Sequence, residues 1–193
     1  MDRNERLLQV ILERTPGKVS QTRLLKFVYM TDLVAWRVLG RPMSEFKYLR
    51  YNHGPFSPAF YTAKEGLLTS GLAEQEEIST RDGFDTTLIW STVREPEEHN
   101  DFTPAELDII DHVISRYRKK KLEEFLNEDV YQTAPMNNAK FGEELPMSAE
   151  KNKDRERFDG LSLDAILESR AAFERGEGIP FEQVRRDILE SLE

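Results

Sequence analysis

The chain has 193 residues, no cysteine and a formal net charge of −9, and its hydrophobic and charged fractions are 38% and 33%. A chain of this length is expected to form about one domain with an additional segment, and the lack of cysteine excludes a disulfide framework, a thiolate nucleophile and a zinc site with cysteine ligands. No apolar run reaches the roughly 18 residues of a membrane-spanning helix, and the charged start MDRNERLLQV does not resemble a signal peptide, so we expect a cytoplasmic protein.

The first two predicted elements are helices joined by a short turn. Apolar residues recur at helical spacing in LLQVIL, so residues 3–14 are expected to form an amphipathic helix. The sequence TPGKVS interrupts this pattern, and Ser20 is a suitable N-cap for a second helix because its hydroxyl can accept a free backbone N–H. This second helix is expected to end at Gly40, with Pro42 just beyond it.

A third helix and a β-hairpin are predicted next. Ser57 would cap the helix, Pro58 would occupy its first position, where a missing N–H has no cost, and Gly71 would end it. The segments LAEQEEI and TTLIWSTV flank the turn-rich STRDGFD, which predicts a β-hairpin. Helices followed by a hairpin indicate a winged-helix-like arrangement.

The segment DFTPAELDIIDHVISRY carries the clearest helix signal. Thr103 would cap this helix, Pro104 would take the first position, and Glu106 would complete a capping box. A shorter helix is expected at residues 122–131. The side chains expected on the buried face of the longer helix are Leu107, Ile110, Val113, Ile114 and Tyr117.

The predicted fold is mainly α with a small β-hairpin, an α+β class in which a winged-helix-like helical domain precedes a C-terminal helical arm. The domain is expected to cover residues 1–133. Residues 134–160 lack periodicity and mix Pro, Asn, Gly and alternating charges, which is typical of a linker or irregular segment. Two short amphipathic helices within residues 161–193 would form the arm.

The stretch YNHGPF places His53 next to a glycine–proline turn. A catalytic base needs a nucleophile or metal ligands close by. The only other histidines are His99 and His112, and no further ligand residues lie near them at the spacing of a metal site. The chain also lacks the common nucleophile, zinc-protease and phosphate-loop motifs. We therefore expect a structural turn, no catalytic residue, no cofactor or metal site, and a protein that is not an enzyme.

Asp32 interrupts the apolar face of the second predicted helix. A buried carboxylate without a partner is costly, so Arg50, His53 or the N–H groups of the glycine turn are expected to supply one. The alternative is that Asp32 lies at the edge of the apolar face and reaches water.

The order of these motifs resembles a known family. A helix with the pattern L-L-K-x-x-Y-x-x-D is followed by G-R-P and by an aromatic strand that ends in a G-P turn. This ordered set resembles the Panacea domain, also called the SocA-like antitoxin domain, over roughly residues 1–140. The motif residues that carry the resemblance are Leu24, Leu25, Lys26, Tyr29, Asp32, Gly40, Arg41, Pro42, Tyr51, Gly54 and Pro55.

The resemblance implies an antitoxin of a toxin–antitoxin system, which neutralises a co-encoded, growth-inhibiting toxin by direct binding. Many partner toxins of this family act on translation. The resemblance also permits an adaptor that delivers the toxin to a cytoplasmic protease. A winged-helix-like regulator that binds operator DNA is the alternative from the predicted elements, and one protein can have both roles. The oligomeric state stays open.

The charge distribution bears on these alternatives. Residues 1–70 contain 11 basic and 6 acidic side chains, whereas the remaining residues contain 16 basic and 30 acidic ones. The acidic part would suit a basic toxin, and the excess of basic residues in the first part is modest for a DNA-binding protein. An uneven distribution of solvated charge without a function explains the same numbers.

The end of the chain, ERGEGIPFEQVRRDILESL, is similar to the C-terminal segments of RelB-like and Phd-like antitoxins. A helix this short is unstable alone in water, so its apolar face must dock on a partner or on the protein's own domain. We interpret this segment as the toxin-contacting arm, while docking on its own domain stays open. The proposed contact residues are Ile179, Pro180, Phe181, Val184, Ile188 and Leu192.

Overall fold

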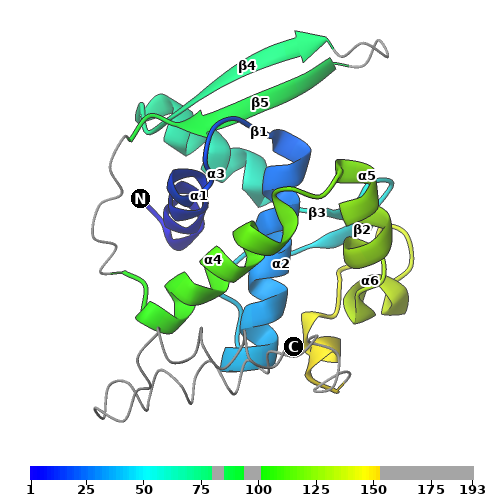
Figure 1. Cartoon of the computed structure of the whole chain (residues 1–193). Coiled ribbons are helices and arrows are strands. Elements are labelled where there is room, and N and C mark those ends of the chain that lie inside the picture. The colour runs from blue at the N-terminus through cyan, green and yellow to red at the C-terminus, as the bar shows by residue number, and fades with distance from the viewer. Residues whose placement is uncertain (80–84, 94–100, 153–193) are drawn as a thin grey trace, which may run out of the picture. The chain divides into compact units, whose positions relative to one another are not determined.

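The computed structural model describes residues 1–79, 85–93 and 101–152 (Figure 1). They belong to one structural unit, which ends at Lys153. The fold is mainly helical with small antiparallel sheets, as the sequence predicts. The predicted arm lies outside the described residues, so the division of the chain into a domain and an arm stays a prediction.

The two N-terminal helices form as predicted. Helix α1 spans Arg3–Arg14 and begins at a capping box in which the Asp2 side chain accepts the backbone N–H of Glu5. Helix α2 spans Gln21–Leu39, with Ser20 as its N-cap and Gly40 at its end in the left-handed conformation. Every residue of α2 from 24 to 35 is buried, which is typical of a helix enclosed by the rest of the domain. Figure 1 shows α2 behind α4, in the middle of the described elements.

A three-stranded antiparallel sheet covers one end of this helical core. Strand β1 (Val19–Ser20) pairs with β5 (Asp85–Ser91), which pairs with β4 (Ala73–Ser79), so the order is β1-β5-β4. Strands β4 and β5 form the predicted hairpin. Strand β1 lies between α1 and α2 and pairs with β5, the last strand of the hairpin. This is the winged-helix-like order of elements (Figure 1).

Two further strands and a helix lie between α2 and the hairpin. Strands β2 (Leu49–Tyr51) and β3 (Gly54–Phe56) pair in an antiparallel ladder. Helix α3 spans Pro58–Thr69 with Ser57 as its N-cap residue, although the Ser57 hydroxyl makes no capping hydrogen bond. The sequence predicts an aromatic strand that ends in a G-P turn, and β2 is that strand. Its partner strand β3 was not predicted, because a strand this short carries no alternating pattern.

Helix α4 spans Pro104–Tyr117 and has the predicted capping box between Thr103 and Glu106. Its buried face differs in one position from the prediction, because Ile109 is buried whereas Leu107 is only half-buried. The capping residue Glu106 is also buried, so the inward face of the helix includes both Glu106 and Ile109.

The segment after α4 contains several short helices. Helix α5 (Leu122–Glu124) continues as a π-helix, η1 (Phe125–Val130), and together they form the helix predicted at residues 122–131. Helix α6 (Ala134–Asn138) and the 3-10 helix η2 (Met147–Asn152) come next, and η2 lies against α2 and α6.

Residues 134–160 were predicted to be a linker or irregular segment, and the described part is an irregular segment with two short helices. Residues 134–152 pack on the domain, where Met136, Ala139 and Leu145 are buried. The backbone N–H of Leu145 donates to the carbonyl of Tyr48 at 2.7 Å. Loops and helices this short bury isolated side chains without periodicity, so the sequence pattern could not reveal this packing. Residues 153–160 lie outside the described residues.

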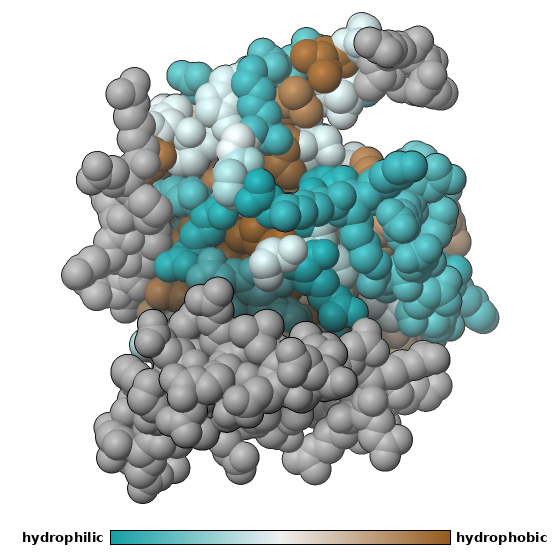
Figure 2. Space-filling model, in the orientation of Figure 1, coloured by the Kyte–Doolittle hydropathy of each residue, from teal (hydrophilic) through white to brown (hydrophobic). Residues whose placement is uncertain are grey.

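Hydrophilic residues cover most of the surface over α4 and α5 in the view of Figure 2, and hydrophobic residues form small separate areas. Among the described residues, no helix is both long enough and apolar enough to cross a membrane.

Candidate binding surface around the β2–β3 turn

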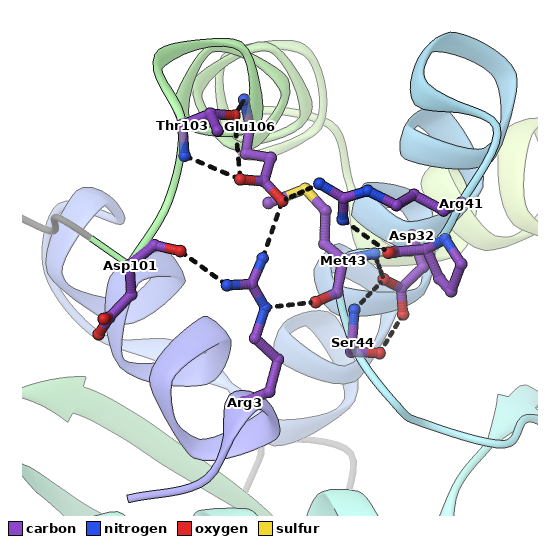
Figure 3. Close-up of polar contacts among 9 residues, drawn as sticks. Arg3, Asp32, Arg41, Met43, Ser44, Asp101, Thr103 and Glu106 are labelled. Carbon is purple, nitrogen blue, oxygen red and sulfur yellow. Dashed lines mark hydrogen bonds and ion pairs between the residues drawn. The ribbon is translucent and has the colours of Figure 1, made fainter.

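The Asp32 carboxylate is fully buried and anchors the loop that follows α2 (Figure 3). It accepts the backbone N–H groups of Met43 and Ser44, each at 2.8 Å. The Tyr48 hydroxyl donates to it at 2.6 Å, and the Ser44 hydroxyl donates to it as well. Burial raises the pKa of Asp32, and these hydrogen bonds oppose the shift.

The prediction that Asp32 is partnered by the glycine turn, Arg50 or His53 is wrong. Arg50 donates instead to the carbonyl of Ala139 at 2.6 Å, and His53 is exposed. The alternative that Asp32 reaches water is also wrong, because its side chain is buried. The actual partners lie in an irregular loop, which carries no sequence pattern that would identify them.

Glu106 joins three segments that are far apart in the sequence (Figure 3). Its carboxylate accepts from Arg3 of α1 at 2.8 Å and from Arg41 of the G-R-P motif at 3.0 Å. It also accepts the backbone N–H of Thr103 at 2.8 Å. Burial acts to raise the pKa of Glu106, but the Thr103 hydrogen bonds and the charges of Arg41 and Arg3 outweigh it and hold the pKa below its usual value. Glu106 therefore connects α1, the loop after α2, and α4.

Two groups hold the β2–β3 turn in place from opposite sides. The Lys26 ammonium donates to the carbonyl of Pro55 at 2.6 Å. On the other side, a β-carbon on Gly54 would lie only 2.7 Å from Cε1 of Tyr131, and the φ of Gly54 is +85°. Only glycine combines this positive φ with so close an approach. The motif residues Lys26, Gly54 and Pro55 thus position the turn.

We expect the change Gly54→Ala to lower the free energy of unfolding by about 3 kcal/mol, through the positive φ and the overlap with Tyr131. Gly17→Ala is the matched control, since Gly17 has a φ of +76° and nothing within 4 Å of an added β-carbon; it should cost about 1 kcal/mol. Urea denaturation measures both. Equal losses in the two variants would show that Tyr131 does not constrain the turn.

The buried ammonium predicts a pH dependence of stability. Lys26 is 2% exposed, and burial lowers its pKa to about 8, against 10.5 for the free side chain. Between these values the unfolded chain holds a proton that the folded protein has lost, so stability rises with pH. The free energy of unfolding of the wild type, minus that of Lys26→Met, should increase by about 1.4 kcal/mol per pH unit from pH 8.5 to 10. A difference that is constant over this range would contradict the burial of a charged Lys26.

The turn carries aromatic side chains that reach the surface. Tyr51 is 49% exposed and Phe141 is 62% exposed, and their rings are stacked with centroids 5.1 Å apart. The ring of Phe56 lies 5.4 Å from Tyr51 and 5.7 Å from Tyr61. We call these four side chains the aromatic row. Exposed aromatic residues that touch one another are typical of surfaces that bind another molecule.

A pocket of about 240 Å³ opens beside the aromatic row. The α2 residues that line it are Gln21, Thr22, Leu25 and Lys26, and the other lining residues are Tyr51, His53, Gly54, Pro55, Phe56 and Tyr61.

Residues 24–129 match the family model described as "Antitoxin SocA-like, Panacea domain". The chain belongs to this family. The comparisons with curated proteins and with solved structures gave no match. The Panacea match contains most of the second helix, the G-R-P motif, the glycine–proline turn and all of α4. Asp32, Glu106 and Lys26 all lie within the matched residues.

Six of the eleven Panacea motif residues, Lys26, Tyr29, Asp32, Tyr51, Gly54 and Pro55, have two roles in the structure. Asp32 and Tyr29 are buried in the core, where the Tyr29 hydroxyl is hydrogen-bonded to the Thr133 hydroxyl at 2.7 Å. The other motif residues, Lys26, Tyr51, Gly54 and Pro55, meet at the β2–β3 turn and line the pocket. The proposed contact residues of the tail, from Ile179 to Leu192, lie outside the described residues.

Phe141, a member of the aromatic row, was not predicted from the sequence. Phe141 lies in the stretch predicted to be a linker, and its position beside Tyr51 depends on a backbone hydrogen bond from Gly142 to the Arg50 carbonyl at 2.8 Å. An aromatic residue next to a glycine within a polar stretch was the one available signal. Among the described residues, no group of three or more His, Asp or Glu side chains could hold a metal ion.

Proposed function

We propose that this protein is an antitoxin that neutralises a co-encoded protein toxin by direct, stoichiometric binding. Membership of the SocA-like antitoxin family carries this proposal. The exposed aromatic row supports it, because Tyr and Phe side chains are enriched at protein interfaces. On this proposal the protein acts in the cytoplasm on a toxin that targets translation, and it is not an enzyme.

A DNA-binding regulator is the second candidate, and the winged-helix-like order of elements favours it. In such domains, the helix before the hairpin and the hairpin itself usually approach DNA. Here the exposed charged residues of α3 and the β4–β5 hairpin include Glu65, Glu74, Glu77 and Asp85, and Lys18 beside the hairpin is paired with Glu76 at 2.6 Å. Acidic side chains repel phosphates, so this surface fits a basic protein better than DNA. Delivery of the toxin to a protease stays a further prediction.

Expression of the neighbouring open reading frame tests the antitoxin proposal. The neighbouring product alone should arrest growth, and co-expression of this protein should restore it. The two proteins should also co-purify. The proposal fails if the neighbouring product is harmless, or if it is toxic and this protein neither binds nor neutralises it.

We further propose that the C-terminal arm contributes to toxin binding through the apolar stripe that contains Phe181. Truncation after Gly160 should weaken toxin binding by at least about ten-fold, because a few buried aromatic anchors usually carry most of the binding energy. Phe181→Ala should reproduce much of this loss, whereas Arg186→Ala, off the stripe, should change affinity little. Titration calorimetry with the purified toxin separates these outcomes. Unchanged affinity of a folded, truncated protein would exclude the arm as a contact.

A further inference from the structure

The pocket beside the aromatic row has an unusual charge balance. Its lining residues include two that can carry a positive charge, Lys26 and His53, and none that is acidic. The neutral polar side chains in the lining, Gln21, Thr22 and the hydroxyls of Tyr51 and Tyr61, can all donate hydrogen bonds. The pocket therefore offers donors to a ligand and favours a negatively charged one.

Lys26 is the group on which this balance depends. Its ammonium is buried and has three N–H donors, of which one is bonded to the Pro55 carbonyl. Burial is what lowers its pKa, with no contribution from a neighbouring carboxylate. Among the described residues, the acidic side chains form their ion pairs with other basic groups. A buried ammonium without a carboxylate is costly, and a carboxylate that enters the pocket would offset that cost with a charge-assisted hydrogen bond.

We propose that this pocket binds a carboxylate of the partner protein that lies next to an aromatic side chain, with the carboxylate on Lys26 and the aromatic ring on the aromatic row. This inference rests on the proposed function, in which the partner is a protein toxin. The row supplies the stacking surface, since Tyr51 and Phe141 are stacked and exposed. The motif residues Gly54 and Pro55 hold the turn so that the pocket and the row stay adjacent.

A peptide fits the surface better than a nucleic acid does. Nucleic acids are bound through several phosphate contacts at once, and the pocket has a single buried ammonium. The nearby cations Arg50 and Lys64 do not line the pocket. Arg50 donates to the Ala139 carbonyl, and Lys64 donates to Gln21 and Gln75. A peptide with a carboxylate next to an aromatic ring can place the carboxylate on the Lys26 ammonium and the ring on the aromatic row.

The test uses the full chain and two small probes that differ only in charge. N-acetyl-phenylalanine carries the carboxylate and the ring, and N-acetyl-phenylalaninamide carries the ring without the charge. In ¹H–¹⁵N NMR titrations at pH 7, the carboxylate probe should shift the amide signals within residues 51–56, of which Pro55 has none. It should also bind about ten-fold more tightly than the amide, the ratio that a charge-assisted hydrogen bond typically contributes.

Three variants assign the effect to the pocket. Lys26→Met should reduce the preference for the carboxylate to less than about two-fold, whereas Lys47→Met, at an exposed lysine of the preceding loop, should keep it. Tyr51→Ala, at a half-exposed position, should weaken both probes and keep their ratio. If Lys26→Met does not fold, the titrations of the wild type and of Tyr51→Ala still show whether the pocket prefers the carboxylate probe and whether the aromatic row binds the ring.

Several results would overturn the inference. In the wild type, these results are equal affinities for the two probes, or no shift of the amide signals within residues 51–56. In Lys26→Met, the result is an undiminished preference for the carboxylate probe. In a competition experiment, the result is displacement of the carboxylate probe by a ribodinucleotide at a lower concentration than that of the probe. The rescue experiment is independent of these titrations. Toxin neutralisation without probe binding would refute only this inference, and probe binding without neutralisation would refute only the antitoxin proposal.

Discussion

Asp32→Leu is expected to lower the free energy of unfolding by about 4 kcal/mol or more, since each buried polar group left without a partner costs about 1–3 kcal/mol. The change removes the acceptor of the backbone N–H groups of Met43 and Ser44 and of the hydroxyls of Ser44 and Tyr48. A leucine side chain cannot accept these hydrogen bonds, and water cannot replace the carboxylate because the site is fully buried. Urea denaturation followed by circular dichroism measures the loss.

Asp32→Asn is the matched control for this prediction. Its side-chain oxygen can accept the two backbone N–H groups, so the loss should be less than half of that in Asp32→Leu. Because burial raises the pKa of Asp32, the advantage of the wild type over Asp32→Asn should be largest below pH 3.8 and should shrink as the pH rises through the folded-state pKa. Similar small losses for Leu and Asn would show that the loop after α2 does not depend on this carboxylate.

Glu106→Leu is expected to have the second-largest effect, a loss of about 3 kcal/mol, because it leaves the Thr103 N–H and two guanidinium groups without their acceptor. The loss is smaller than for Asp32 because Arg3 and Arg41 are partly exposed and can turn to water. Thermal and urea denaturation both measure it.

Glu106→Gln separates the hydrogen bonds from the charge. It keeps an acceptor for Thr103 and loses the ion pairs with Arg3 and Arg41, so about half of the loss should remain. Because the pKa of Glu106 is held low, its contribution is present above pH 4.5 and is lost as the pH falls through the folded-state pKa. If Glu106→Gln is as unstable as Glu106→Leu, the whole stabilisation by Glu106 comes from its charge and none comes from the hydrogen bond to Thr103.

Local signals in the sequence were sufficient for most of the helices. Caps such as Ser20 and the Thr103–Glu106 box involve residues three apart, and they act in the structure as the sequence predicts. The burial of Asp32 was also detectable, because a carboxylate interrupts an otherwise apolar face.

Long-range partners were not predictable from one sequence. Glu106 reads as a capping residue, yet its cationic partners lie 103 and 65 residues away. Met136 and Leu145 are buried in a segment whose helices are too short to show periodicity, so the sequence of this segment resembles a linker. For the same reason the pocket stayed hidden, since α2 and the β2–β3 turn meet only in the folded chain.

The stoichiometry of toxin neutralisation tests the central claim of direct binding most directly. Purified toxin is titrated with this protein in the assay that reports the toxin's activity, and the mass of the toxin is then measured after the complex is dissociated in denaturant. Direct binding predicts that activity falls in proportion to added protein, ends at a fixed molar ratio, and leaves a toxin of unchanged mass. Complete neutralisation by a small fraction of a molar equivalent, with a covalently altered or cleaved toxin, would contradict the account and make this protein an enzyme.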